Sequence, residues 1–362
     1  MANPDVNQEF AAQWSVPGDV FSVLLLLGPD VISWVAFAVN ATVQAFGEDV
    51  LLPESDCPCL VINAKNGHVR ENSSWVIGRL MRDYGNWCGP EVHKKVLQVL
   101  DMRLNQMKEE YKQKGESNTD IARLQRPARA GLVIAIYTVK GGPRTTPGYD
   151  RMYFSGIVVM VCQIAISAIP WGLYHDWSIF LITICGTLLA LFTGALPQWR
   201  REKWACRKQG KAKTVVLTQG QGSQYAIVIM TNKMGFDLED LAGARRISYT
   251  NPRWLTKLGV GALGVFWVML LIAAAGIKRN TWFLLLVGGL GIVQNLYVAG
   301  AMRTPLEYGI DLSPGPIFGH PKVFKAISEA ERVYPGLGRS MVGIFFPKGL
   351  TESEEKELSG IA

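Results

Sequence analysis

Acidic side chains within apolar stretches are the residues of this sequence best suited to carry out chemistry. Asp30 follows Pro29 inside the apolar run from Phe21 to Phe46. A carboxylate within a bilayer costs about 2.5–3.5 kcal/mol on insertion scales, so its presence there indicates a function. Burial in an apolar site keeps such a group protonated, which is the state that a general acid needs. The alternative is that the span starts at Val31 and that Asp30 lies at the membrane surface.

A second acidic residue, Asp176, stands beside His175 in the short link between two other apolar runs. An aspartate beside a histidine can hold a proton, so Asp176 competes with Asp30 for the role of acid. The same pair can also serve only the conformation of a tight turn.

Further polar and aromatic side chains in the apolar runs could line a shared cavity and bind a substrate. They are Trp34, Gln163, Trp171, Gln294 and Asn295. The alternative role of the amide side chains is hydrogen bonding between helices. The alternative for the tryptophans is a place in the aromatic belt at the membrane interface.

Five apolar runs are long enough to cross a hydrocarbon core of about 30 Å, which takes about 20 helical residues. The chain of 362 residues is 49% hydrophobic and only 19% charged, whereas soluble domains carry about 25% charged residues. We therefore predict an α-helical integral membrane protein with about five transmembrane helices. The predicted spans are residues 21–46, a hairpin over 152–196 with helices 152–174 and 177–196, and a hairpin over 256–301 with helices 256–277 and 281–301.

Connectivity places the three long polar segments on one side of the membrane. These segments are residues 47–151, 197–255 and 302–362, while residues 1–20 and the two short turns fall on the other side. All but two of the 37 Lys and Arg residues lie in the polar segments or at their edge, at Lys257. The positive-inside rule therefore predicts cytosolic segments and a lumenal N-terminus, which we assign to the endoplasmic reticulum. The net charge of +7 then indicates attraction to anionic lipid rather than to nucleic acid.

Short β-rich runs and amphipathic segments predict a cytosolic α+β elaboration. Residues 214–218 and 225–230 flank "QGQGSQ" and predict a β-hairpin, and residues 132–139 predict another strand. Helices are predicted over residues 90–114 and 322–334. "DLED" (237–240) is typical of a helix N-terminus, and "SPGPIFGHP" (313–321) is typical of turns.

Other motifs do not support a cofactor or a metal. "GVGALG" (259–264) matches the dinucleotide fingerprint as text, but it lies inside an apolar run without a preceding strand. "CPC" (57–59) has no second pair of cysteines at zinc spacing, and Cys88 is expected to be a reduced thiol. Three histidines stand singly and are assigned surface or packing roles: His68, His93 and His320.

Several long stretches resemble a widespread set of fungal polytopic membrane proteins. They are "LPESDCPCLVINAKNGHVRENSSWVIGRLMRDY", "AIPWGLYHDWSIFLITICGTLLALFTGALPQWRREKWACR", "KTVVLTQGQGSQYAIVIM" and "FDLEDLAG". The resemblance covers most of residues 20–300 and extends to the membrane-bound terpene cyclase of ascofuranone-type meroterpenoid biosynthesis. None of these stretches is a catalytic motif, so the resemblance assigns no site residue by family position.

The resemblance implies an enzyme of fungal secondary metabolism that opens and cyclises an epoxidised farnesyl chain on an aromatic head. The reaction is redox-neutral and needs no metal or cofactor. An acid, Asp30 or Asp176, would protonate the epoxide oxygen, and aromatic walls would stabilise the positive charge that develops. The expected partners are a lipophilic prenylated substrate and membrane lipid. The alternatives are a membrane transporter, or a membrane scaffold whose polar segments are the working part.

Overall fold

The computed structural model describes residues 52, 55–115, 121–142, 149–207, 212–232, 235–243 and 254–361. These residues form two compact units. The helical unit includes the described residues within Tyr149–Glu202 and Ser248–Ala301, and the α/β unit includes those within Pro53–Gly148, Lys203–Ile247 and Met302–Ala362. The predicted segments 1–20 and 21–46 lie outside the described residues.

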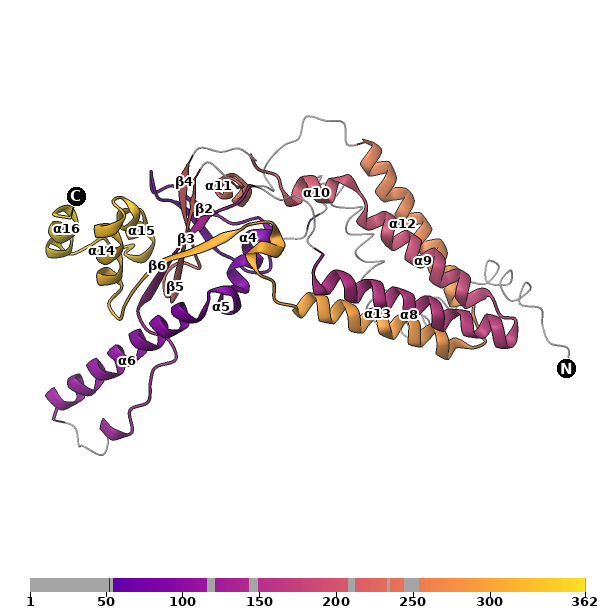
Figure 1. The fold of residues 1–362 in the computed structure, drawn as a ribbon, viewed down its shortest axis with the longest axis horizontal. Coiled ribbons are helices and arrows are strands. Elements are labelled where there is room, and N and C mark those ends of the chain that lie inside the picture. Colours follow the sequence, from indigo (N-terminus) through magenta and orange to yellow (C-terminus); the bar gives the residue numbers. More distant parts are fainter. Residues whose placement is uncertain are drawn as a thin grey trace. The chain divides into compact units, whose positions relative to one another are not determined.

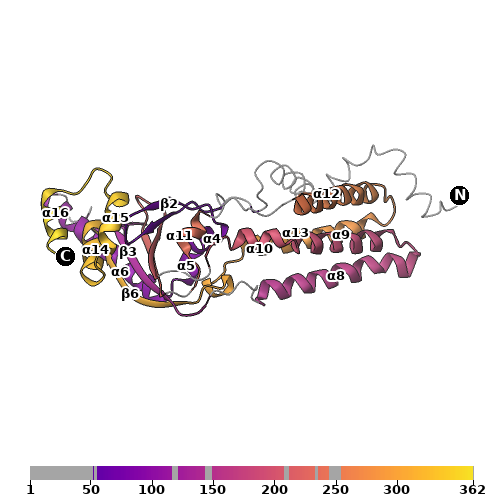
Figure 2. The same cartoon turned by 90° about the horizontal axis from the view of Figure 1, so that it is seen from above.

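Four long helices make up the helical unit (Figure 1). They are α8 (Arg151–Tyr174), α9 (Ser178–Gly194), α12 (Trp254–Ala275) and α13 (Thr281–Gly300). Their sequences are apolar all round rather than on one face, which is typical of helices surrounded by lipid or other helices. Helix α8 packs against α9 and α13, and α9 packs against α12 (Figures 1 and 2).

Three helices among the described residues are long and apolar enough to cross a membrane: Arg151–Tyr174, Lys257–Ala275 and Thr281–Gly300. Helix α9 falls short because it ends at Gly194, and a new helix, α10 (Pro197–Lys203), begins at a proline. The two helices are bent by 42° relative to each other, and they make a fourth candidate if they form one broken span.

A six-stranded mixed sheet organises the α/β unit, with the strand order β2-β1-β4-β5-β3-β6. Strands β3 and β5 run parallel, and every other neighbouring pair is antiparallel. The strands are β1 (Leu60–Asn63), β2 (Val69–Glu71), β3 (Leu132–Val139), β4 (Lys213–Thr218), β5 (Tyr225–Thr231) and β6 (Leu312–His320). The central strands β3 and β5 are nearly continuous apolar runs because they are buried on both faces.

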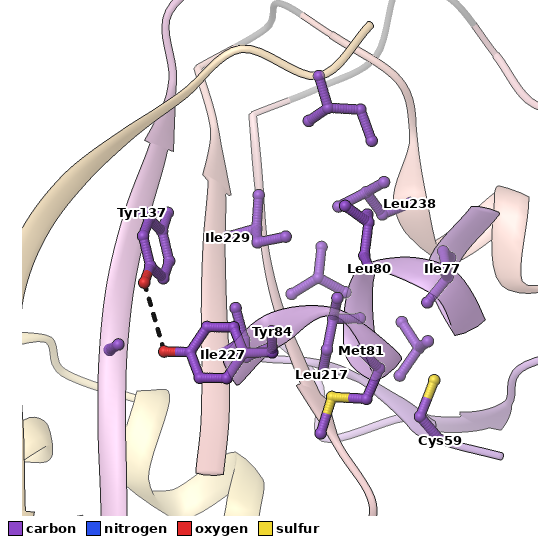
Figure 3. Close-up of a cluster of buried hydrophobic side chains, with 14 of the residues drawn as sticks. Cys59, Ile77, Leu80, Met81, Tyr84, Tyr137, Leu217, Ile227, Ile229 and Leu238 are labelled. Atoms are coloured by element: carbon purple, nitrogen blue, oxygen red, sulfur yellow. Dashed lines mark hydrogen bonds between the residues drawn. The ribbon is translucent and has the colours of Figure 1, made fainter. Parts of the chain in front are cut away.

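Helices cover both faces of this sheet, so the α/β unit has two hydrophobic cores. Ile227 and Ile229 of β5 point into the first core, which Figure 3 shows, whereas the alternate residues Ala226 and Val228 point into the second. The first core is formed with α4 (Trp75–Arg82), α5 (Tyr84–Trp87), α6 (Pro90–Gln113) and α11 (Leu238–Ala242). The second is formed with α14 (Val323–Val333) and α15 (Leu337–Phe345).

Short elements complete the α/β unit. The 3₁₀ helix η3 (Pro305–Tyr308) places Tyr308 in the first core, and its N-terminus has a capping box between Thr304 and Glu307. The last helix, α16 (Glu352–Ser359), packs against α14 and begins with a second capping box.

The prediction of a mainly α-helical membrane protein with about five transmembrane helices is wrong. The described residues form a mixed α/β structure with a six-stranded sheet, and they contain three candidate spans, or up to four. The apolar runs dominate the sequence pattern, whereas β1, β2 and β6 are short, exposed or rich in proline and leave little trace in it. "SPGPIFGHP" forms most of strand β6 instead of the predicted turns.

Several local predictions are confirmed. Strands β4 and β5 form the predicted antiparallel hairpin around "QGQGSQ", and β3 covers residues 132–139 as predicted. Helices α6 and α14 match their predicted ranges to within one residue at each end. Asp237 caps the N-terminus of α11, where its side chain accepts a hydrogen bond from the backbone N–H of Asp240.

Candidate functional site

Asp176 lies buried in the turn between α8 and α9, where its carboxylate accepts three hydrogen bonds. The backbone N–H and the hydroxyl of Ser178 donate to Oδ1 over 3.2 and 2.5 Å. The side-chain amide of Asn280, in the turn between α12 and α13, donates to Oδ2 over 2.9 Å. The carboxylate therefore joins the two turns of the helical unit and satisfies a backbone donor at the start of α9.

His175 terminates α8 in the left-handed conformation, with φ of 56°. Its side chain is exposed, while Asp176 beside it is buried. The backbone N–H of the cap donates to the carbonyl of Pro170, which closes the end of the helix. These contacts give His175 and Asp176 a conformational role in the turn, and the proton-holding role of Asp176 stays a prediction.

Two glutamines connect α8 and α13 in opposite directions. Gln163 of α8 donates from Nε2 to the backbone carbonyl of Val287 over 2.9 Å, and it lies against Gly291 of α13. Gln294 of α13 donates from Nε2 to the hydroxyl of Ser155 on α8 over 2.9 Å. Small residues let the helices approach, and the amides then bond across the contact.

The remaining predicted binding residues in the described part of the chain are Trp171 and Asn295. Trp171 is half exposed, and its ring packs against Phe180 with centroids 5.0 Å apart. Asn295 is exposed on α13. Asp30 and Trp34 lie outside the described residues, so the proposed acid and its aromatic neighbour stay predictions.

The α/β unit contains a charged cluster around the start of β4, which we call the Lys213 cluster. Nζ of Lys213 lies 2.7 Å from Asp237 and 2.9 Å from Glu239, and both carboxylates are buried. Asn63 at the end of β1 donates to the same Glu239 oxygen as Lys213, over 2.8 Å. The cluster comprises Asn63, Arg70, Arg207, Lys213, Asp237, Glu239 and Asp240.

The ion pairs of this cluster fix the charge of its members. Burial lowers the pKa of Lys213, but its hydrogen bonds to Asp237 and Glu239 outweigh burial and raise the pKa above the usual value. Burial raises the pKa of Glu239, but hydrogen bonds from Lys213 and Asn63 outweigh it and lower the pKa. A lysine that stays protonated is a poor nucleophile. The Lys213 cluster therefore attaches α11 to strands β1, β2 and β4 rather than offering a reactive amine.

Sequence reasoning placed "DLED" at a helix N-terminus but missed that its carboxylates meet Lys213. A signal was present, because Lys213 is the one charged residue of the strand KTVVLT, whose middle residues 215–217 are apolar. Such a lysine needs partners when it is partly buried. Among the described residues, no group of three or more Cys, His, Asp or Glu side chains is arranged to hold a metal ion.

No family model, curated protein or solved structure matches this chain.

Proposed function

We propose that this chain is a membrane scaffold protein, in which apolar helices hold the α/β unit at the cytosolic face of a membrane. The observation that carries the proposal is the use of the polar side chains in the helical unit. Gln163, Gln294 and Asp176 all bond to neighbouring helices or turns of the same unit. Polar groups that hydrogen-bond within the bundle stabilise it, whereas a transport path or an intramembrane active site needs polar groups that are directed at the ligand.

The order of the chain supports an anchor with all of its polar mass on one side. Each helix pair, α8 with α9 and α12 with α13, is preceded and followed by residues of the α/β unit. If each pair crosses the membrane and returns, the whole α/β unit lies on one side. The distribution of Lys and Arg favours the cytosolic side, and we propose the endoplasmic reticulum as the membrane.

Membrane fractionation with a topology assay tests this proposal. The full chain is expressed with a tag after residue 362, and microsomes are washed with alkaline carbonate and then treated with protease. We expect the chain to stay in the membrane pellet and the C-terminal tag to be digested without detergent. Release of the chain by carbonate, or protection of the tag until detergent is added, would contradict the proposal.

Terpene cyclisation stays a second proposal, supported by the resemblance of the stretches quoted above. The hydrogen bonds of Asp176 favour Asp30 over Asp176 as its acid, since two of the three donors are N–H groups that require an acceptor. Microsomes would be given an epoxyfarnesyl phenol, and the products separated by mass and retention. A new isomer of unchanged mass that is formed by the wild type and lost in Asp30→Asn would support the cyclase. Absence of an isomer with folded protein present would contradict it for this substrate class.

A further inference from the structure

A thiol and an imidazole meet at the start of α6, outside every site considered so far. Sγ of Cys88 lies 3.4 Å from Nε2 of His93. Cys88 follows helix α5 directly, and His93 is in the first turn of α6. The cysteine is 4% exposed, whereas the histidine is exposed. The pair therefore places a buried nucleophile under a base that reaches the surface.

Tyrosines hold the backbone of Cys88 in place. The hydroxyl of Tyr137 on β3 donates to the carbonyl oxygen of Cys88 over 3.1 Å. The hydroxyls of Tyr137 and Tyr84 lie 3.3 Å apart, which Figure 3 shows as a dashed line. Both tyrosines belong to the first core, and their burial raises the pKa of each phenol, so they remain neutral donors at physiological pH. The thiol thus has a fixed position relative to the sheet.

The N-terminus of α6 lies next to this pair. The helix is 24 residues long, starts with Gly89 as its N-cap and Pro90 as its first residue, and has no side-chain cap. The first N–H groups of a helix have no partner within the helix, and they carry partial positive charge. Such groups stabilise the negative oxygen that forms when a thiol adds to a carbonyl.

Burial raises the pKa of the Cys88 thiol, so the resting pair is a neutral thiol beside an imidazole. A neutral thiol reacts slowly, because the thiolate is the nucleophile. The imidazole at 3.4 Å can accept the proton as the thiol attacks, which is general-base catalysis.

From this geometry we infer that Cys88 takes an acyl group from an acyl thioester, with His93 as the general base. Sγ bonds to the carbonyl carbon while its proton passes to Nε2 of His93. The bond from that carbon to the departing sulfur then breaks, and the departing thiolate takes the proton from the imidazolium. One thioester is exchanged for another, so no oxidant or reductant is needed. The covered thiol restricts the reaction to short acyl groups such as acetyl.

Cys59 supplies a matched control within the same unit. It is 5% exposed, and burial raises its pKa to about 12, but its thiol interacts with Asn72 and not with an imidazole. Exposure alone therefore predicts similar access to Cys59 and Cys88, whereas base assistance predicts that only the reaction of Cys88 depends on His93.

The experiment uses the full chain, purified in detergent and incubated with acetyl coenzyme A. Peptide mass analysis follows acetylation of each cysteine with time, in the wild type, in Cys88→Ser and in His93→Gln. We expect Cys88 to react faster than Cys59, and His93→Gln to slow Cys88 about 100-fold without changing Cys59.

Two results would overturn the inference. One is acetylation of Cys88 at the rate of Cys59, and the other is an unchanged acetylation rate of Cys88 in His93→Gln. Because His93 is exposed, its substitution is not expected to unfold the chain, and a thermal denaturation of each variant checks this. Neither result bears on the membrane anchor, which is tested by fractionation.

Discussion

Replacing Lys213 with methionine removes the cation that two buried carboxylates share. Asp237 and Glu239 have side chains that are 2% and 9% exposed. Methionine fills a similar volume but offers no charge and no hydrogen bond. The substitution therefore tests whether the Lys213 cluster stabilises the α/β unit or makes no net contribution to its stability.

The loss of folding stability in this variant depends on how deeply the two carboxylates are buried and on the cations that remain near them. Removing one partner of a buried ion pair costs about 3–5 kcal/mol, because the other charge is left uncompensated. Two features reduce this. Lys213 is 21% exposed, so solvent already screens part of the interaction. Arg207 stays 3.6 Å from Asp237, and Arg70 stays 3.5 Å from Glu239. We therefore expect a loss of about 2–3 kcal/mol.

Hydrogen exchange measures this loss locally, at the backbone amides of β1 and β4. A loss of about 2–3 kcal/mol makes exchange about 30- to 150-fold faster, since each 1.4 kcal/mol is tenfold. Arg103→Met is the matched control: its guanidinium pairs with Glu110 over 2.9 Å, but both side chains are more than one third exposed. That control should cost less than about 1 kcal/mol. A similar, small effect of both substitutions would refute the reasoning.

Three further predictions concern other parts of the molecule. Gly131→Ala should destabilise the α/β unit by about 1–3 kcal/mol or more in denaturant titrations, because φ is +66° and a Cβ would lie 2.2 Å from the His320 carbonyl oxygen; an unchanged midpoint would contradict this. Gln163→Leu should lower the stability of the helical unit by about 0.6–2 kcal/mol in thermal denaturation in detergent, and a stabilised variant would count against the interhelical bond. The pKa values of Glu239 and Asp240 are lowered in the folded state. Their contribution to folding stability is therefore fully present above the unfolded pKa values, which are about 4.5 for Glu239 and 3.8 for Asp240, and it is lost as the pH falls through the lower folded values. Exchange protection of α11 that stays constant through this acid range would contradict the last prediction.

The sequence predicts those parts of the fold that depend on neighbouring residues. Strand β3 is a run of eight mostly β-branched and apolar residues, and the β4–β5 hairpin has glycines with positive φ, Gly220 and Gly222, in its turn. Helix α6 has apolar residues at helical spacing and a proline at its first position. Each of these signals lies within one element, so no knowledge of the rest of the chain is needed.

Strand β6 escaped prediction because its stability comes from a distant partner. Its sequence, LSPGPIFGH, contains two prolines, which cannot donate hydrogen bonds to a neighbouring strand. It lies at the edge of the sheet, where proline is tolerated, and among the described strands it pairs only with β3. A Cβ at Gly315 would lie only 3.1 Å from the Ile136 carbonyl oxygen, so glycine favours the close approach of the two strands. Only the pairing of residues about 180 positions apart makes this segment a strand.

The sites were harder to predict for the same reason. Residue type alone left two roles open for Asp176 and Gln163, and the hydrogen bonds that favour a structural role are made with residues more than 100 positions away. Cys88 and His93 are the opposite case. They are only five residues apart, but Cys88 follows α5 whereas His93 lies in α6, and the turn at Gly89 brings them together. A pattern of scattered single histidines does not reveal such a turn.

The use of polar groups also suggests where any chemistry of this chain takes place. A reactive group must keep at least one interaction for its substrate to complete. In the turn between α8 and α9, the carboxylate of Asp176 accepts three hydrogen bonds. Gln163 and Gln294 bond across the α8–α13 contact. The α/β unit instead carries an imidazole that is exposed on one side and bonded to a buried thiol on the other. We therefore expect the helices to anchor this protein and the α/β unit to react, and acetylation of Cys88 is the direct test of that division.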